Sequence, residues 1–251
     1  MEDLKEHKKH YVTEHERHFK GKEISDVILG GQDGLVNVLG VTLGVASATN
    51  DPLITLVAGL AATFAETISM AAVAYTSVKA DRDYYQAERK LEEEEVEKMP
   101  EHEIEEIREI YAKKGFKGKL LNDVVKVITS NKKVWVDTMM TEELNLSLRF
   151  GGSPLKSALV VFIAALIGSL IPLIPFALFN LLSVANAVIV SVILSVIVLF
   201  IVGVIKARLT IGNWFTSGLE LAVIGMSAAF AGYLIGWGLG KVFGTNVASV
   251  V

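Results

Sequence analysis

The sequence of 251 residues contains no cysteine. This absence excludes disulfides, thiolate metal sites, iron–sulfur clusters and a cysteine nucleophile. An excess of positive charge is also missing, because the formal net charge is −4, which argues against nucleic acid as a partner. The first 23 residues are charged throughout and lack the apolar stretch of a secretory signal peptide.

Charged residues are scarce over most of the chain. Of the 52 Asp, Glu, Lys and Arg residues, 43 lie in residues 1–26 and 80–154, and only 9 lie in the other 150 residues. A soluble globular protein distributes polar positions along every amphipathic element, so this partition excludes one. The apolar share of 51% also excludes a disordered chain. The distribution therefore predicts a membrane protein with two polar segments.

Five apolar segments are long enough to span a bilayer as helices, which takes roughly 20 residues for about 30 Å of hydrocarbon. Residues 157–205 hold no charge, and Pro172, Pro175 and Asn180 mark a turn within them. Strands of a barrel would alternate in polarity with a period of two, and these segments do not. We therefore predict an all-α polytopic membrane protein with spans near residues 27–50, 53–78, 156–177, 183–205 and 217–240.

The placement of Lys and Arg predicts the orientation, because cytosolic loops carry an excess of basic residues. The N-terminal segment holds six basic residues and the segment 79–156 holds many more, whereas the turns around Asp51 and Asn180 hold none. We expect residues 1–26 and 80–154 in the cytosol and the C-terminus outside. The predicted domains are 1–26, spans one and two in 27–79, a helical domain in 80–154, and spans three to five in 155–251.

The polar segment 80–154 has helical character, with boundary signals at Met99-Pro100 and at Gly115. We expect a small three-helix domain, whose first helix can continue directly from the second span. The third helix is predicted from an apolar stripe at roughly helical spacing, formed by Leu120, Val124, Val127, Ile128, Val134, Trp135 and Met139.

Eleven glutamates lie between Glu88 and Glu109. Within them Glu92/Glu95 and Glu103/Glu106 are spaced i, i+3, which puts each pair on one helical face. Met139 and Met140 lie one helical turn before Glu143. Carboxylates suit Mn²⁺ and Fe²⁺, and a thioether adds a softer ligand that Mg²⁺ and Ca²⁺ do not favour. The competing interpretation is a solvated helix face, with its glutamates paired to Lys or Arg, next to two core methionines.

Two carboxylates lie inside predicted spans, Asp33 in the first and Glu66 in the second. An ionisable group at the centre of a span costs about 2.5–3.5 kcal/mol on insertion scales, so it marks a functional site by default. Counting from the cytosolic ends places Met70 level with Asp33, and Glu66 one turn further out. We predict a cation path lined by Asp33, Asn37, Glu66 and Met70.

Each of these features has a simpler alternative. The two carboxyl groups could be hydrogen-bonded acids that only tune helix association. Glu220, near the inner end of the fifth span, could reach the membrane interface. The glycines of the first span fit either a wetted lining or close helix packing, and those of the fifth span fit packing: Gly30, Gly40 and Gly44, and Gly232, Gly236 and Gly240.

The sequence resembles the vacuolar iron transporter (VIT) family. The resemblance is carried by Asp33-Gly34-Leu35-Val36 with Leu39-Gly40-Val41, by Ile68-Ser69-Met70, and by Trp135-Val136-Asp137-x-Met139-Met140-x-x-Glu143. The five-span layout with a long acidic insert after the second span also matches. The chain departs at Val38, where many members have a proline, and at Ala62, where some have a glutamate that Glu66 would replace from one turn away.

The resemblance implies a homodimeric exporter that moves Fe²⁺, and often Mn²⁺, out of the cytosol in exchange for protons. Its partners are then the lipid bilayer, divalent metal ions, protons and a second copy, with no prosthetic group. It implies a transport path through Asp33 and Met70. It also implies a cytosolic metal site that uses Glu92, Glu95, Glu103, Glu106, Met139, Met140 and Glu143. We expect the cell membrane of a prokaryote as the location.

Two other classes compete with a transporter. A membrane-attached di-iron oxidase would use Glu-x-x-His elements, and none of the five histidines has a glutamate three residues before it. A membrane-anchored metal sensor or storage protein would not need Asp33 and Glu66 inside its anchor. The spacing of the pairs His7/His10 and His15/His18 could bind metal weakly, but a solvated helix face is the expected place for them.

Overall fold

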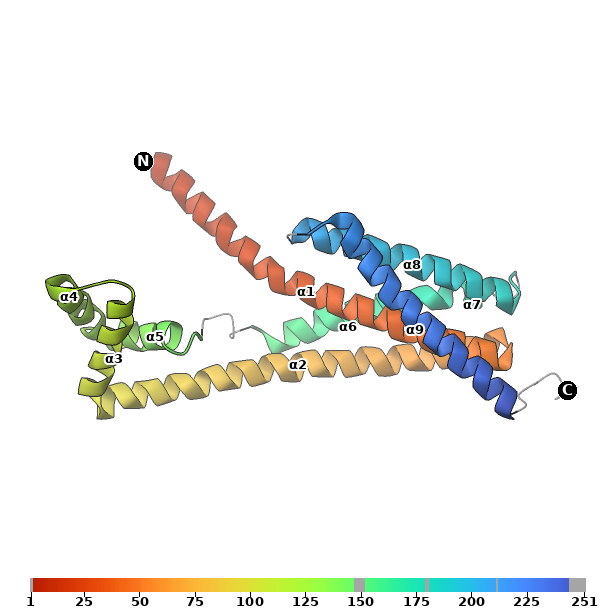
Figure 1. Ribbon diagram of the computed structural model, residues 1–251, viewed down its shortest axis with the longest axis horizontal. Coiled ribbons are helices and arrows are strands. Elements are labelled where there is room, and N and C mark those ends of the chain that lie inside the picture. Colours follow the sequence, from red (N-terminus) through yellow and green to blue (C-terminus); the bar gives the residue numbers. More distant parts are fainter. Residues whose placement is uncertain (1, 147–151, 179–180, 211, 244–251) are drawn as a thin grey trace. The chain divides into compact units, whose positions relative to one another are not determined.

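The computed structural model describes the backbone of residues 2–146, 152–178, 181–210 and 212–243, and side chains from residue 23 onward within these ranges (Figure 1). His7, His10, His15 and His18 lie outside the described side chains. Every regular element in the described ranges is a helix, as predicted. The helices are α1 (Glu2–Thr49), α2 (Pro52–Lys98), α3 (Pro100–Lys113), α4 (Gly118–Thr129), α5 (Lys132–Glu142), α6 (Pro154–Leu170), α7 (Ile174–Ala177), α8 (Val184–Leu209) and α9 (Trp214–Phe243), with a 3₁₀ turn at Ile171–Leu173.

Five segments of the described chain are long and apolar enough to cross a membrane, which confirms the five predicted spans. They lie in Glu23–Thr49, Pro52–Lys98, Pro154–Ala177, Val184–Leu209 and Trp214–Val242. The helix of the fourth span, α8, runs further than predicted because Lys206 and Arg208 occupy its last turn. Basic side chains at a helix C-terminus interact favourably with the helix dipole, so the helix continues through them.

A tight turn joins α1 to α2. Asn50 has a positive φ of 51°, the left-handed conformation that commonly ends a helix. The Asp51 carboxylate accepts hydrogen bonds from the backbone N–H of Leu53 (2.8 Å) and Ile54 (2.9 Å), which caps the start of α2. Because this turn is short, the two helices that carry Asp33 and Glu66 are adjacent in the chain and antiparallel.

The chain divides into two compact units. The membrane unit comprises Met1–Ala74 and Leu155–Val251, and the polar unit comprises Tyr75–Pro154. Helix α2 is continuous from Pro52 to Lys98, so it contributes its first part to one unit and its last part to the other. This continuity agrees with the expectation that the first helix of the polar segment continues the second span.

Glycines of α1 lie against the backbones of neighbouring helices in the membrane unit. A Cβ at Gly30 would lie 2.7 Å from the carbonyl oxygen of Val161 in α6. A Cβ at Gly232 or Gly236 of α9 would overlap the carbonyl oxygens of Gly40 and Gly44, respectively. Figure 1 shows α9 crossing α1 in this unit. These glycines therefore serve close packing of helices, which is the simpler of the two interpretations of the sequence.

Replacing Gly236 with Ala is expected to destabilise the membrane unit, because the new methyl group would force α9 away from α1. Overpacking of this kind costs about 1–3 kcal/mol. Gly238 provides the matched control, since a Cβ there meets no atom within 4 Å in the described chain. Thermal unfolding in detergent should show a lower midpoint for Gly236→Ala than for Gly238→Ala. Equal midpoints would contradict the packing role.

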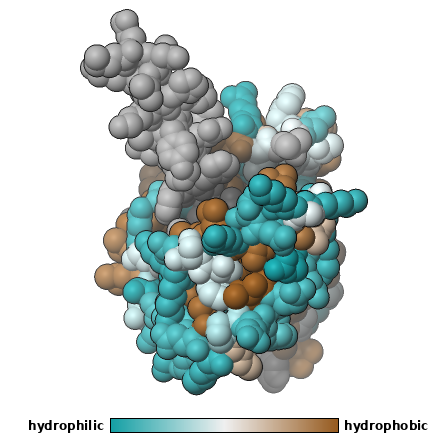
Figure 2. Space-filling model, turned by 90° about the vertical axis from the view of Figure 1, so that its left-hand side faces the viewer, coloured by the Kyte–Doolittle hydropathy of each residue, from teal (hydrophilic) through white to brown (hydrophobic). Residues whose placement is uncertain are grey.

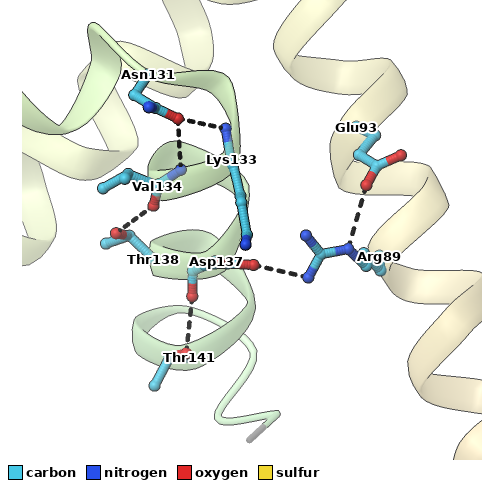
Figure 3. A network of polar contacts seen from close by, with 8 residues as sticks. All are labelled: Arg89, Glu93, Asn131, Lys133, Val134, Asp137, Thr138 and Thr141. Carbon is cyan, nitrogen blue, oxygen red and sulfur yellow. Dashed lines mark hydrogen bonds and ion pairs between the residues drawn. The ribbon is translucent and has the colours of Figure 1, made fainter. Parts of the chain in front are cut away.

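The polar unit contains one more helix break than predicted. The predicted third helix is two helices, α4 and α5, because Asn131 accepts hydrogen bonds from the N–H groups of Lys133 and Val134 and so starts α5 (Figure 3). The predicted apolar stripe is wrong in part. Leu120, Val127 and Val134 are exposed, whereas Ile128, Trp135 and Met139 are buried.

An apolar core holds the polar unit together. It contains Val96 of α2, Ile107 of α3, Val125 and Ile128 of α4, Trp135, Val136, Met139 and Met140 of α5, and Leu146. The outer face of this unit is largely hydrophilic, with scattered apolar side chains (Figure 2). The polar unit thus has the residue distribution of a soluble helical domain, with an apolar interior and a charged surface.

Candidate functional site

The membrane unit brings the two intramembrane carboxyl groups together. Asp33 on α1 and Glu66 on α2 are both half-buried, and their side chains are within hydrogen-bonding contact. The Asn37 amide, one turn beyond Asp33, donates a hydrogen bond of 3.0 Å from Nδ2 to Glu66 Oε1. Three of the four residues predicted for the path therefore form one polar group between two apolar helices.

Met70 follows Glu66 by one helical turn and is half-buried. Counting from the cytosolic ends placed Asp33 level with Met70, whereas the structure places Asp33 at Glu66. The cause is the tight turn at Asn50 and Asp51: Asp33 precedes Asn50 by 17 residues and Glu66 follows Asp51 by 15, so the two lie at similar depth from the turn. For estimating which residues of the two helices lie at the same depth, the tight turn is therefore a better reference point than the predicted cytosolic ends.

Small and hydroxyl residues surround this polar group. A Cβ at Gly34, next to Asp33, would lie 2.5 Å from the carbonyl oxygen of Ala165. Thr63 and Thr67 on α2 are fully buried, and each donates its hydroxyl to the carbonyl four residues earlier. The Ser169 hydroxyl is buried and has no hydrogen-bond partner within the described chain. Helix α1 therefore packs closely against α6 next to Asp33, while Asp33 and Glu66 themselves are only half-buried.

Glu220 does not belong to this group. Its carboxylate lies 4.0 Å from the ammonium of Lys206 at the neighbouring end of α8, and its side chain is largely exposed. This position fits an ion pair near the membrane interface.

In the polar unit, ion pairs divide the glutamates into two sets. The first set pairs with cations: Glu93 with Arg89, Glu94 with Lys98, Glu97 with Lys132, Glu105 with Arg108, and Glu109 with Lys113. Glu106 lies 3.4 Å from His102. In the second set, Glu92, Glu95, Glu103 and Glu143 form no ion pair with Lys or Arg among the described residues. The solvated-face interpretation therefore holds for the first set and fails for the buried members of the second, Glu92 and Glu103.

Two glutamates of the second set are buried. Glu92 of α2 is 5% exposed and Glu103 of α3 is 2% exposed, and one carboxylate oxygen of each is buried without a hydrogen-bond partner in the described chain. Burial raises the pKa of Glu92 to about 7, and the charges of Glu143, Glu103, Glu95 and Glu106 add to the shift. Burial followed by the charge of Glu106 likewise raises the pKa of Glu103 to about 7. The members of this cluster therefore repel one another when they are ionised.

Glu143, just after α5, belongs to the same electrostatic cluster. Burial raises its pKa, and the charges of Glu106 and Glu95 raise it further, while His102 lowers it. All five predicted glutamate ligands, Glu92, Glu95, Glu103, Glu106 and Glu143, thus influence one another electrostatically. Such a cluster of like charges, partly desolvated and with only His102 as a nearby basic group among the described residues, is an unstable arrangement that a divalent cation would stabilise.

The two predicted methionine ligands lie in the apolar core. Met139 is fully buried and Met140 is 1% exposed, among Val96, Ile107 and Trp135. Within the described part of the chain, no group of three or more His, Cys, Asp or Glu residues already has the geometry to hold a metal ion. The polar unit therefore holds the predicted glutamates as one electrostatic cluster and the predicted methionines in its apolar core, with no preformed coordination shell among the described residues.

Sequence reasoning missed one polar network in this unit. Arg89 on α2 donates to Asp137 on α5 over 2.7 Å and to Glu93 over 3.1 Å (Figure 3). Asp137 was visible only as part of the Trp-Val-Asp motif, and its partner lies 48 residues away in the chain. The only signal in the sequence was the position of Arg89 inside an acidic run, where an arginine is expected to pair with carboxylates.

Fold and site together define a class: an all-helical multi-pass membrane protein with a carboxylate pair within its spans and an acidic helical unit. The pattern of the VIT family matches residues 24–237, and the chain belongs to this family. It is 35% identical over 219 residues to Vacuolar iron transporter 1 of Oryza sativa subsp. japonica, covering 87% of this chain and 86% of that protein. It is 35% identical over 221 residues to Vacuolar iron transporter 1 of Arabidopsis thaliana, covering 88% of each.

A relative outside plants is the Vacuolar iron transporter of Toxoplasma gondii, 34% identical over 233 residues, covering 90% of this chain and 77% of that protein. The names of these relatives are those of transporters and not of enzymes, in agreement with the prediction from the sequence. They also refer to the vacuole, whereas the sequence was expected to belong to the cell membrane of a prokaryote.

Proposed function

We propose that this protein transports divalent transition-metal ions across a membrane, with Fe²⁺ as the principal cargo and Mn²⁺ as a second one. The observation that carries the proposal is the contact of Asp33 and Glu66, joined by Asn37, within the apolar part of α1 and α2. Carboxylate and amide oxygens are ligands for such ions. The relatives named as iron transporters support the choice of Fe²⁺.

The transport step uses the two carboxyl groups as exchange sites. A divalent cation that binds between Asp33 and Glu66 displaces their protons, since metal binding to carboxylates requires their ionised form. Protons arriving from the other side release the metal. Met70, one turn from Glu66, offers the next ligand along α2. Two carboxyl groups accommodate the exchange of one metal ion for two protons.

The polar unit collects metal before transport. Its cluster of glutamates supplies oxygen donors, and Met139 and Met140 in the core of the same unit supply thioether donors. The basic residues that flank the spans favour the cytosol for this unit and for the N-terminus, and the outside for the C-terminus. Transport then runs out of the cytosol, either through the cell membrane or into an organelle.

The working form is a homodimer. Asn37 is exposed on the surface of a single chain, within the apolar span of α1. A polar side chain that faces lipid is costly, so such groups normally face protein or water. The apolar part of α2 is also the least buried of the five spans, since only 17% of this stretch is buried within a single chain. A second copy against this face would cover both.

The test is transport in proteoliposomes that contain a pH-sensitive dye. We expect Fe²⁺ uptake to move protons in the opposite direction, and an imposed proton gradient to drive Fe²⁺ against its own gradient. Mn²⁺, Co²⁺, Zn²⁺ and Ca²⁺ measured in parallel define the selectivity, with Ca²⁺ as the ion expected to fail. Absence of any metal flux would refute a transporter, and flux without proton movement would refute exchange.

A further inference from the structure

Helix α5 is held in place by three ion pairs, one near its start, one in its middle and one at its end. Lys132 pairs with Glu97 of α2, Asp137 pairs with Arg89 of α2, and Glu142 pairs with Lys114 just after α3. Along α2 the partners run backward from Glu97 to Arg89 while those on α5 run forward, so α5 lies antiparallel to this end of α2. Together with the apolar core that contains Met139 and Met140, these pairs fix where the two methionines and Glu143 lie relative to the glutamates of α2 and α3.

The middle pair is the most extensively built of the three. The Arg89 side chain is only 28% exposed, and its guanidinium donates to Asp137 across the helix interface and to Glu93 one turn further on its own helix (Figure 3). The hydrogen bond to Asp137, followed by one to Tyr85, raises the pKa of Arg89. A planar guanidinium that is hydrogen-bonded on several sides has little conformational freedom, so it fixes the relative position of the two helices that it joins.

We propose that Arg89 is a positioning residue, which through Asp137 fixes α5 against α2 so that the thioethers of α5 meet the carboxylates of α2 and α3. It thereby sets the preference of the polar unit for Fe²⁺ over Mn²⁺. This inference rests on the proposed role of that unit in metal binding. The two predicted thioether donors, Met139 and Met140, are on α5, whereas Glu92 and Glu103 are on α2 and α3. Thioethers favour the softer ion, while carboxylates alone suit Mn²⁺.

Positioning and simple electrostatics predict opposite results. Removing the positive charge of Arg89 leaves Glu93 and Asp137 unpaired next to the cluster, and the added negative field would tighten the binding of any divalent cation. Loss of positioning instead weakens binding, and it does so more for the ion that uses the thioethers. The sign and the metal dependence of the change therefore distinguish the two effects.

The experiment titrates the full-length protein in detergent micelles with Fe²⁺, under anaerobic conditions, and separately with Mn²⁺. For Arg89→Gln we expect about a 10-fold loss of Fe²⁺ affinity and at most about a 3-fold loss of Mn²⁺ affinity. The loss of about 10-fold is at the low end of the effects seen when a group that orients metal ligands is removed. The reversed pair Arg89→Asp with Asp137→Arg should restore part of the preference. Arg89→Lys, which keeps the charge but loses the fork, should fall between wild type and Arg89→Gln.

Lys98→Gln is the matched control. It removes the same charge from the same helix and frees Glu94, but Lys98 makes its ion pair within α2 and does not hold α5. Tighter binding of both metals by Arg89→Gln, unchanged binding, or equal weakening for both metals would each overturn the inference. A wild-type protein that binds neither metal would instead contradict the proposed function. If Arg89→Gln does not fold, Asp137→Asn breaks the same contact from the other side.

Discussion

Replacing Asp33 with Asn is expected to abolish Fe²⁺ transport in proteoliposomes. The amide is nearly the same size as the carboxylate, so the packing of α1 should survive. It cannot carry a negative charge or release a proton, and Glu66 alone would have to neutralise a divalent ion in a poorly solvated place. We expect a loss of at least about 100-fold, more than is usual for residues that only orient metal ligands. The initial rate of Fe²⁺ uptake is the measurement.

Asp51→Asn is the matched control for this variant. Asp51 undergoes the same chemical change on the same pair of helices, but it lies in the turn between them and caps α2. Asn is as good a cap as Asp, so both stability and transport should be retained. Glu66→Gln should resemble Asp33→Asn, although its amide oxygen can still accept the hydrogen bond from Asn37. Undiminished Fe²⁺ flux in Asp33→Asn would refute the proposed path.

Much of the membrane unit was predictable from the sequence because insertion into lipid depends on local composition. The scarcity of charge between residues 157 and 205 was enough to predict two spans there. The contact between Asp33 and Glu66 was predicted only in outline, because depth was counted from the wrong ends. The role of Gly232 and Gly236 in packing depends on Gly40 and Gly44, almost two hundred residues away, and only the structure brings these backbones together.

The polar unit was less predictable, since its charges are arranged by long-range partners. Nothing local distinguishes Glu92, which is buried, from Glu94, which is exposed and paired with Lys98. The distinction comes from the burial of one face of α2 against α3 to α5. The break at Asn131 was missed for a related reason: a stripe of apolar residues continues across a helix cap when the next helix resumes at a similar spacing.

Replacing both Glu92 and Glu103 with Gln is expected to have opposite effects on stability and on metal binding. The raised pKa values mean that the folded protein holds protons between about pH 4.5 and 7 that the unfolded chain releases. The stability that these two groups contribute to the metal-free protein is therefore greatest below about pH 4.5 and is lost as the pH rises through about 7. The double variant removes this loss, so at pH 8 without metal it should unfold at a higher temperature than the wild type.

Metal reverses this order. Above pH 7 the wild-type carboxylates are ionised and bind Fe²⁺ or Mn²⁺, which stabilises the folded state by mass action. Below pH 7 protons compete with the metal, so wild-type affinity should fall by up to about 100-fold per pH unit if both groups must lose a proton. The double variant should show neither the stabilisation by metal nor this pH dependence. The measurement is thermal unfolding of the full-length protein at pH 6 and pH 8, with and without Mn²⁺.

The control for these two substitutions is Glu94→Gln with Glu105→Gln. These glutamates belong to the same two helices, but they are exposed and paired with Lys98 and Arg108. Exposed ion pairs contribute little to stability, so the control should keep both the stabilisation by metal and its pH dependence. If the control loses them to the same extent, metal binds to the diffuse charge of the acidic run. If only the buried pair matters, the burial of Glu92 and Glu103 is what converts an acidic surface into a site that exchanges protons for metal.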